Sequence, residues 1–175
     1  MFRPTYIFNG IEEIEIDFLK RERIKYLLMD VDNTIIDSKI NIPPKKLKWI
    51  QDVKKSGIEL CILSNSGNLR KIKMVGERLD IPYLLNGCKP LKKGFEMACK
   101  ILDAKPENTA IIGDQVFTDI WGANRFKIRS ILVMPFDSKE RFWIKIKRPL
   151  EKIVLKSIKS VDIIKATRKK NRKWI

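Results

Sequence analysis

One short apolar run constrains this chain more than any other feature of its sequence, because it ends in two closely spaced aspartates. Residues 26–29 read Tyr-Leu-Leu-Met, and Asp30, Val31 and Asp32 follow directly. In an extended backbone, alternate side chains project to the same side, so the two carboxylates lie together. Polar side chains at the carboxyl end of a buried strand are typical of α/β sheets, which bind their ligands there.

The paired acids favour a reactive site, although D-x-D-x-T segments also occur in ordinary loops. Like charges this close repel, so the pair requires a bound cation or a proton on one acid. A metal-held aspartate can act as a nucleophile, and a partly protonated one can act as general acid and base. An EF-hand is excluded, because the sixth loop position is Ile35 rather than Gly and the twelfth is Asn41 rather than Glu.

Three further polar signals adjoin apolar or helical patterns later in the chain: Ser64 and Asn65 after residues 61–63, Lys89 before Pro90, and Asp114 and Asp119 after residues 110–113. The hydroxyl and amide of the first signal can bind a phosphoryl oxygen or cap the next helix. The lysine, taken alone, is a solvated charge. The two later acids repeat the pattern of a strand that ends in a carboxylate.

Strand-like runs alternate with helical patterns through the middle of the chain. We expect strands near residues 26–30, 58–63, 83–85, 109–113 and 130–134, and helices near 44–56, 68–79, 91–102 and 119–125. Residues 9–22 read as a short helix before the first strand. The alternation predicts a three-layer, Rossmann-like α/β fold, in which helices cover both faces of a central parallel sheet.

The four polar signals, in this order, resemble the four motifs of the haloacid dehalogenase (HAD) superfamily between about residues 24 and 135. The spacings are 34, 25 and 25 positions, each enough for one β-α unit, between Asp30, Ser64, Lys89 and Asp114. The resemblance implies a Mg²⁺-dependent phosphatase that forms an aspartyl-phosphate.

The resemblance also implies a role for each matching residue. Asp30 would be the nucleophile, and Asp32 would protonate the leaving oxygen and then activate water. The residues that would bind the phosphoryl oxygens are Ser64, Asn65 and Lys89. Magnesium would be held by Asp30, the main-chain carbonyl of Asp32, and Asp114. Asp119 would order the metal's waters or the Lys89 ammonium.

The spacings leave no room for the cap domain that many members of this superfamily carry. About 25 residues separate Thr34 from the next expected strand, which one helix and a short flap occupy. One helix and one short strand fill the interval from Ser64 to Lys89. A capless site is open, which favours large substrates, whereas small metabolites would need a lid from another subunit.

Within the superfamily, the chain resembles subfamily IIIA and its YqeG and mitochondrial phosphatidylglycerophosphate phosphatase group. The matching segments read D-x-D-N-T, S-N-S, C-K-P and G-D-Q-x-x-T-D-I-x-G-A-N. The resemblance implies a phospholipid head group as substrate. A nucleic-acid end or a small phosphorylated metabolite is the alternative with the same chemistry. A non-catalytic, basic RNA- or ribosome-binding protein is the alternative from another class.

Positive charge is concentrated near the C-terminus. The chain has a net charge of +16, and residues 138–175 hold fourteen Lys or Arg against three Asp or Glu. Apolar residues recur at helical spacing from Leu150 to Ile164, with lysines on the opposite face. This basic segment is either a helix packed on the sheet or a surface for polyanions such as anionic lipid or, less favoured, RNA.

Several absences narrow the function further. The chain has no His, which excludes histidine acid–base catalysis and His-ligated zinc. Its three Cys show no C-x-x-C spacing, as in a reducing cytosol. No apolar run approaches a membrane span, and no signal peptide is evident. We therefore expect a single domain over residues 1–175, cytoplasmic and in peripheral contact with the inner membrane surface.

Overall fold

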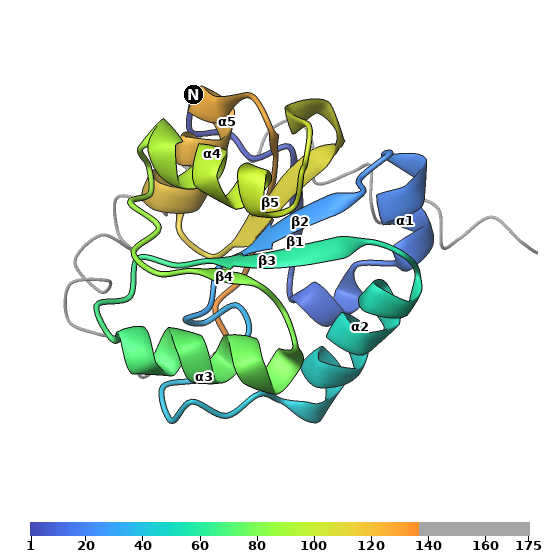
Figure 1. The fold of residues 1–175 in the computed structure, drawn as a ribbon. Helices are drawn as coiled ribbons and strands as arrows, with labels where there is room; N and C mark the ends of the chain where they lie inside the picture. The colour runs from blue at the N-terminus through green and yellow to red at the C-terminus, as the bar shows by residue number, and fades with distance from the viewer. Residues whose placement is uncertain (137–175) are drawn as a thin grey trace, which may run out of the picture. The chain divides into compact units, whose positions relative to one another are not determined.

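A six-stranded parallel sheet forms the centre of residues 1–136, the part of the chain that the computed structural model describes (Figure 1). The strands are β1 (Tyr6–Phe8), β2 (Tyr26–Met29), β3 (Glu59–Leu63), β4 (Tyr83–Leu84), β5 (Thr109–Gly113) and β6 (Arg129–Val133). Their order is β1-β6-β5-β2-β3-β4, and every neighbouring pair is parallel. The predicted α/β fold is confirmed.

The register of the central strands aligns the loops that carry the motifs. Met29 on β2 pairs with Ile62 on β3 and with Ile112 on β5. Since these strands run in the same direction, the residues that follow them emerge at one edge of the sheet. Asp30 and Ser64 therefore begin neighbouring loops, and the loop after β5 lies on the other side of Asp30.

Helices cover both faces of the sheet and complete the three layers (Figure 1). One face carries α1 (Ile16–Arg21), α2 (Pro44–Lys55) and α3 (Leu69–Leu79), and the other carries α4 (Lys92–Ile101) and α5 (Trp121–Phe126). Leu27 and Met29 of β2 pack in the core with α2 and α3, whereas Leu28 packs in the core with α4. Burial on both faces explains why β2 is a continuous apolar run.

The N-terminus of α3 is fixed by a side-chain cap. The Oδ1 atom of Asn68 accepts a hydrogen bond from the backbone N–H of Lys71, at 3.0 Å. Asparagine is among the preferred residues at this position, because its side chain satisfies one of the free N–H groups of the first turn. Because the cap binds the backbone of Lys71, it fixes the position from which the Lys71 side chain extends.

The structure adds detail that the sequence patterns did not predict. The three-residue strand β1 pairs with β6, and residues 9–22 form a 3₁₀ turn, η1 (Ile11–Glu13), before α1 rather than one helix. A π-helical turn, η3 (Val116–Ile120), precedes α5, so the helix expected at 119–125 begins later. The predicted helical pattern from Leu150 to Ile164 lies outside the described residues.

The described residues contain no domain inserted between β2 and β4: α2 follows one loop after β2, and α3 alone connects β3 to β4. This agrees with the capless architecture expected from the motif spacing. Among residues 1–136, no helix has the length and apolar composition needed to cross a membrane.

Candidate active site

The site begins where β2 ends. The backbone N–H of Asp30 still donates to the Ile112 carbonyl, at 2.9 Å, so this residue is held by the sheet. After it the chain turns tightly: Asn33 has a φ of 60°, and the N–H groups of Thr34 and Ile35 both donate to the Val31 carbonyl. The loop thus presents Asp30 and Asp32 at the carboxyl edge of the sheet.

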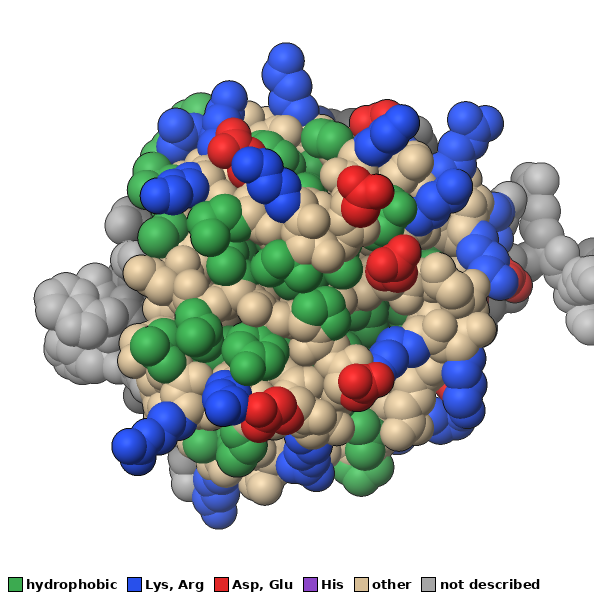
Figure 2. Space-filling model, viewed as in Figure 1, with side chains coloured by type: hydrophobic (Ala, Val, Ile, Leu, Met, Phe, Trp, Pro, Cys, Tyr) green, Lys and Arg blue, Asp and Glu red, His purple; other side chains and the backbone are tan. Residues whose placement is uncertain are grey.

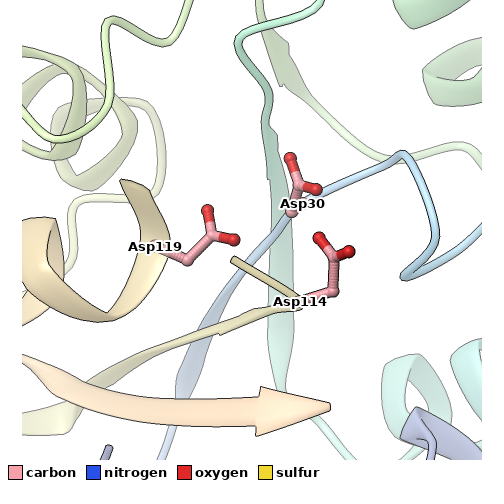
Figure 3. Close-up of side chains that lie close together, drawn as sticks. All are labelled: Asp30, Asp114 and Asp119. Atoms are coloured by element: carbon pink, nitrogen blue, oxygen red, sulfur yellow. The ribbon is translucent and has the colours of Figure 1, made fainter. Parts of the chain in front are cut away.

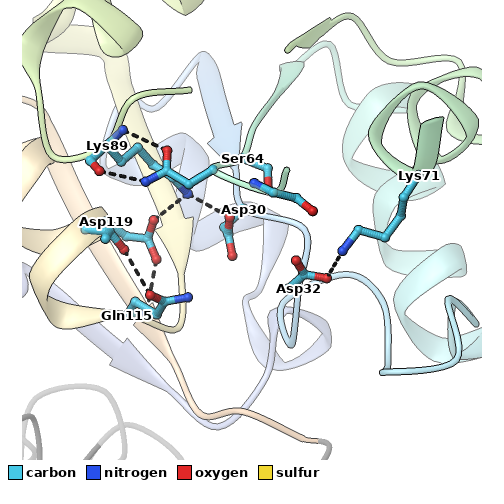
Figure 4. Close-up of polar contacts among 10 residues, drawn as sticks. Asp30, Asp32, Ser64, Lys71, Lys89, Gln115 and Asp119 are labelled. Carbon is cyan, nitrogen blue, oxygen red and sulfur yellow. Dashed lines mark hydrogen bonds and ion pairs between the residues drawn. The ribbon is translucent and has the colours of Figure 1, made fainter. Parts of the chain in front are cut away.

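Lys89 connects the first and fourth motifs. Its Nζ atom lies 2.7 Å from Oδ1 of Asp30 and 2.6 Å from Oδ1 of Asp119, and all three side chains are buried (Figure 4). Burial alone would lower the pKa of Lys89, but the carboxylates of Asp119 and Asp30 outweigh it and hold that pKa above its ordinary value. The site therefore contains a fixed positive charge against the predicted nucleophile.

Burial and the Lys89 ammonium act in opposite directions on the pKa of the Asp30 carboxyl. Burial raises its pKa to about 6, although the Lys89 ammonium opposes the rise. Its second oxygen, Oδ2, is buried and has no hydrogen-bond partner among the residues that the structure describes. A buried carboxylate oxygen of this kind is stabilised by a bound cation.

Three buried acids converge beside Lys89. One carboxylate oxygen from each lies within 4.8 Å of the others in the cluster of Asp30, Asp114 and Asp119 (Figure 3). Hard oxygen ligands of this kind suit Mg²⁺, which usually keeps several waters and takes only one or two carboxylates. The donor set therefore fits the expected metal. Asp30 and Asp114 were predicted as ligands, whereas Asp119 was predicted to support them.

The position of Asp119 depends on a close approach at the end of β5. Its Oδ1 accepts from Lys89, and its Oδ2 accepts from the backbone N–H of Gln115, at 3.0 Å. A Cβ added to Gly113 would lie 2.3 Å from Oδ2 of Asp119, so a side chain there would displace this carboxylate. Of the two roles expected for Asp119, its contacts favour orienting the Lys89 ammonium.

Asp32 lies on the other side of Asp30 and forms a different ion pair. Its carboxylate contacts the Nζ atom of Lys71, which reaches down from the first turn of α3 (Figure 4). The Lys71 side chain is 6% exposed and that of Asp32 is 30% exposed. Sequence reasoning missed Lys71. A lysine in the first turn of a helix opposes the helix dipole, but Lys46 in α2 and Lys93 in α4 share this position, so the pattern does not single out Lys71.

The turn after β3 positions Ser64 and anchors Lys89. The Ser64 hydroxyl is buried and accepts from the Ser66 N–H, at 3.2 Å. The side chain of Asn65 pairs with the main chain of Lys89: its amide donates to the Lys89 carbonyl at 2.6 Å, and its Oδ1 accepts from the Lys89 N–H at 2.8 Å. These contacts give Asn65 a part in placing Lys89, while its predicted contact with phosphate stays a prediction.

A third buried lysine, Lys46, contacts the loop that follows β2. Its Nζ atom donates to the Thr34 carbonyl at 3.0 Å and pairs with Glu12 at 3.1 Å. Burial lowers the pKa of Lys46, and the Glu12 carboxylate opposes this. Lys46 thereby ties the segment after Asp32 to η1. No sequence pattern pointed to this contact.

Comparison with known proteins identifies the family of this chain. A family model described as HAD-hydrolase-like matches residues 87–135. The Bacillus subtilis (strain 168) protein named "Probable phosphatase YqeG" is 33% identical over 159 residues, which are 90% of this chain and 92% of that protein. The chain belongs to the HAD family of phosphatases. The family model's match to this HAD phosphatase includes Lys89, Asp114 and Asp119.

Solved structures share the fold of this HAD phosphatase. An uncharacterized protein from Listeria monocytogenes serotype 4b matches with a TM-score of 0.54 and 19% identity, over 77% of this chain and 99% of that one. The cobalt-bound deoxy-D-mannose-octulosonate 8-phosphate phosphatase YrbI of Haemophilus influenzae matches with a TM-score of 0.51 and 18% identity, over 79% and 91%. HAD phosphatases use Mg²⁺, in keeping with the acidic cluster.

Proposed function

We propose that this HAD phosphatase hydrolyses phosphomonoesters through an aspartyl-phosphate on Asp30, with Mg²⁺ as cofactor, and that its substrate is a phospholipid head group such as phosphatidylglycerophosphate. One observation supports the chemistry most strongly. The Asp30 carboxylate is buried at the strand end, with Oδ1 on Lys89 at 2.7 Å and Oδ2 without a partner among the described residues. A nucleophile must be held in place while one of its oxygens stays available for attack.

The first half-reaction transfers the phosphoryl group to the protein. An Asp30 oxygen attacks phosphorus as the bond to the ester oxygen breaks, and Asp32 gives its proton to that leaving oxygen. The Ser64 hydroxyl and the Lys89 ammonium bind the phosphoryl oxygens and offset their charge. In the second half-reaction, Asp32 takes a proton from water, the water oxygen attacks phosphorus, and inorganic phosphate leaves with Asp30 regenerated.

The metal would be held by Asp30, Asp114 and the main-chain carbonyl of Asp32. When bound, Mg²⁺ supplies positive charge that lets a phosphate dianion enter a site lined by acids. Asp119 keeps the Lys89 ammonium between itself and Asp30. Lys89 is then available to the phosphoryl group without being free to move.

Three features support a lipid substrate at a membrane surface. No inserted domain covers the loops after β2 and β3 in the described residues. Three leucines that follow β3 or β4 in the chain are exposed: Leu69 begins α3, Leu85 follows β4, and Leu91 immediately precedes α4. The view in Figure 2 shows hydrophobic side chains across the face formed by α3, β4 and α4, with Asp and Glu among them and Lys and Arg mostly toward the edge. Exposed apolar side chains with Lys and Arg nearby are found in proteins that dock peripherally on anionic bilayers.

A direct test compares substrates with the full chain. Phosphate release would be measured from phosphatidylglycerophosphate in vesicles, a sugar phosphate, a 5′-phosphorylated oligonucleotide and p-nitrophenyl phosphate, with Mg²⁺ and with excess chelator. We expect Mg²⁺-dependent release from all reactive substrates and the highest kcat/KM on the lipid. Full activity in chelator would refute the metal assignment. A higher kcat/KM on the oligonucleotide or the sugar phosphate would refute the lipid assignment.

A further inference from the structure

We propose that Lys71 is a binding residue for a second anionic group of the substrate, located on the leaving-group side of the phosphoryl centre. The phosphatase would then prefer phosphomonoesters whose leaving group carries a negative charge a few atoms from the ester oxygen. This inference rests on the proposed function, because it uses Asp32 as the group that meets the leaving oxygen.

The side chain of Lys71 is held in one place by its backbone. Its N–H donates to the Asn68 cap at 3.0 Å, and Asn68 in turn donates its own N–H to the Ser66 hydroxyl at 3.3 Å. The turn between Ser64 and α3 is therefore a connected series of hydrogen bonds. A lysine that begins from a fixed turn and is 6% exposed delivers its ammonium to a defined point.

That point lies on the leaving-group side. Figure 4 shows Asp30 between two ion-paired centres, with Lys89 and Asp119 on one side and Asp32 and Lys71 on the other. The Asp30 side chain is 5% exposed, whereas the Asp32 side chain is 30% exposed. Asp32 is the most exposed of these five side chains, so we expect the remainder of a substrate to extend toward it.

The chemistry of Lys71 suits an additional anion. An ammonium has three N–H donors. Among residues 1–136, the Nζ atom of Lys71 contacts one acceptor group, the Asp32 carboxylate. Taking an ammonium out of water is costly unless acceptors replace its hydration. A phosphodiester or a second phosphate beside Asp32 would supply such acceptors through charge-assisted hydrogen bonds.

A simpler interpretation gives Lys71 no contact with substrate. In that case the ion pair only orients Asp32, and loss of Lys71 would slow substrates with similar leaving alcohols by the same factor, since they need the same proton transfer. The two interpretations differ in substrate selectivity, which a purely orienting residue would not change.

The experiment uses two soluble probes and the full chain with Mg²⁺. Both probes are propane-1,3-diol with a phosphate monoester on one hydroxyl. The second hydroxyl carries a methyl phosphodiester in the charged probe and a methyl ether in the neutral probe. The variants are Lys71→Met, which removes the charge, and Lys71→Arg, which keeps it. The matched control is Lys73→Met, which removes a lysine that is 61% exposed two positions along the same helix.

We expect wild type to favour the charged probe and Lys71→Met to lose roughly tenfold to a hundredfold in kcat/KM on it, the range for a charge-assisted contact. Loss on the neutral probe should be several times smaller, Lys71→Arg should restore much of the preference, and Lys73→Met should change neither rate. Equal losses on both probes, or no wild-type preference, would overturn the inference while the phosphatase assignment stands. If wild type hydrolyses neither probe nor p-nitrophenyl phosphate, the proposed function fails as well.

Discussion

Two buried lysines approach one loop from opposite sides, and their surroundings differ. Lys89 is enclosed by the carboxylates of Asp30 and Asp119, at 2.7 and 2.6 Å. Lys71 contacts the carboxylate of Asp32, whose side chain is 30% exposed. The two proposals above therefore give the same residue type two roles: the enclosed Lys89 would fix charge at the reacting phosphoryl group, whereas Lys71 would add a charged group of the substrate as a partner.

The largest expected effect is on the enclosed side, from Asp30→Asn. An amide is nearly isosteric with a carboxylate but cannot attack phosphorus, so phosphatase activity should fall by roughly 10⁴ or more, as for other removed nucleophiles. Steady-state hydrolysis of p-nitrophenyl phosphate measures this. Asp80→Asn is the matched control, because it makes the same change on a side chain that is 98% exposed. Substantial activity in pure Asp30→Asn would mean that another group reacts.

Lys89→Met should show the next largest effect, and it should affect both turnover and folding. Removing one charge donor from a phosphoryl-transfer site typically lowers kcat by about 10² to 10³. Two buried carboxylates would also lose their counter-charge, so the free energy of unfolding should fall by about 3–5 kcal/mol. Denaturant unfolding of the metal-free protein measures the second effect. The free energy of unfolding should fall clearly less in Lys71→Met, because water can reach the Asp32 carboxylate. Equal losses in the two variants would contradict the distinction between the two lysines.

Asp114→Ala tests whether the acids on the enclosed side hold a cation. Its activity should require a higher Mg²⁺ concentration or be lost, because the metal would lose a ligand. Without metal, the variant should be as stable as wild type or more stable by on the order of 1 kcal/mol, since removing one acid relieves repulsion in the cluster. A Mg²⁺ titration of activity and metal-free unfolding curves would measure both. An unchanged Mg²⁺ requirement would contradict the ligand assignment.

The smallest effect is expected for Lys46→Met, at a buried lysine outside the reacting centre. The substitution removes the hydrogen bond from Lys46 to the Thr34 carbonyl. The ionic partner of Lys46, Glu12, is 32% exposed and can be hydrated in the variant. The free energy of unfolding should fall by about 1–2 kcal/mol. Thermal or urea unfolding beside Lys89→Met gives the comparison. If Lys46→Met lost as much unfolding free energy as Lys89→Met, burial of the lysine alone, rather than its contact with two carboxylates, would determine the loss.

The sequence predicted the parts of this molecule whose signals are local. Apolar runs that end in polar residues located β2, β3 and β5 and placed Asp30, Ser64 and Asp114 at one edge, because parallel strands share a direction. The strand β1 escaped prediction, since three residues carry too little pattern and its pairing with β6 is long-range. Lys46 and Lys71 escaped for a related reason: only the folded chain shows which charged side chain is buried and which partner it meets.

The most direct measurement of the central claim is to find where the phosphoryl group resides during turnover. Wild-type protein turning over p-nitrophenyl phosphate with Mg²⁺ would be quenched and treated with borohydride, which reduces an acyl phosphate to an alcohol, and the peptides would be examined by mass spectrometry. We predict that Asp30 is converted to homoserine in wild type during turnover, and not when substrate or Mg²⁺ is withheld. Conversion of a different aspartate, or none at Asp30 while phosphate is being released, would contradict the account.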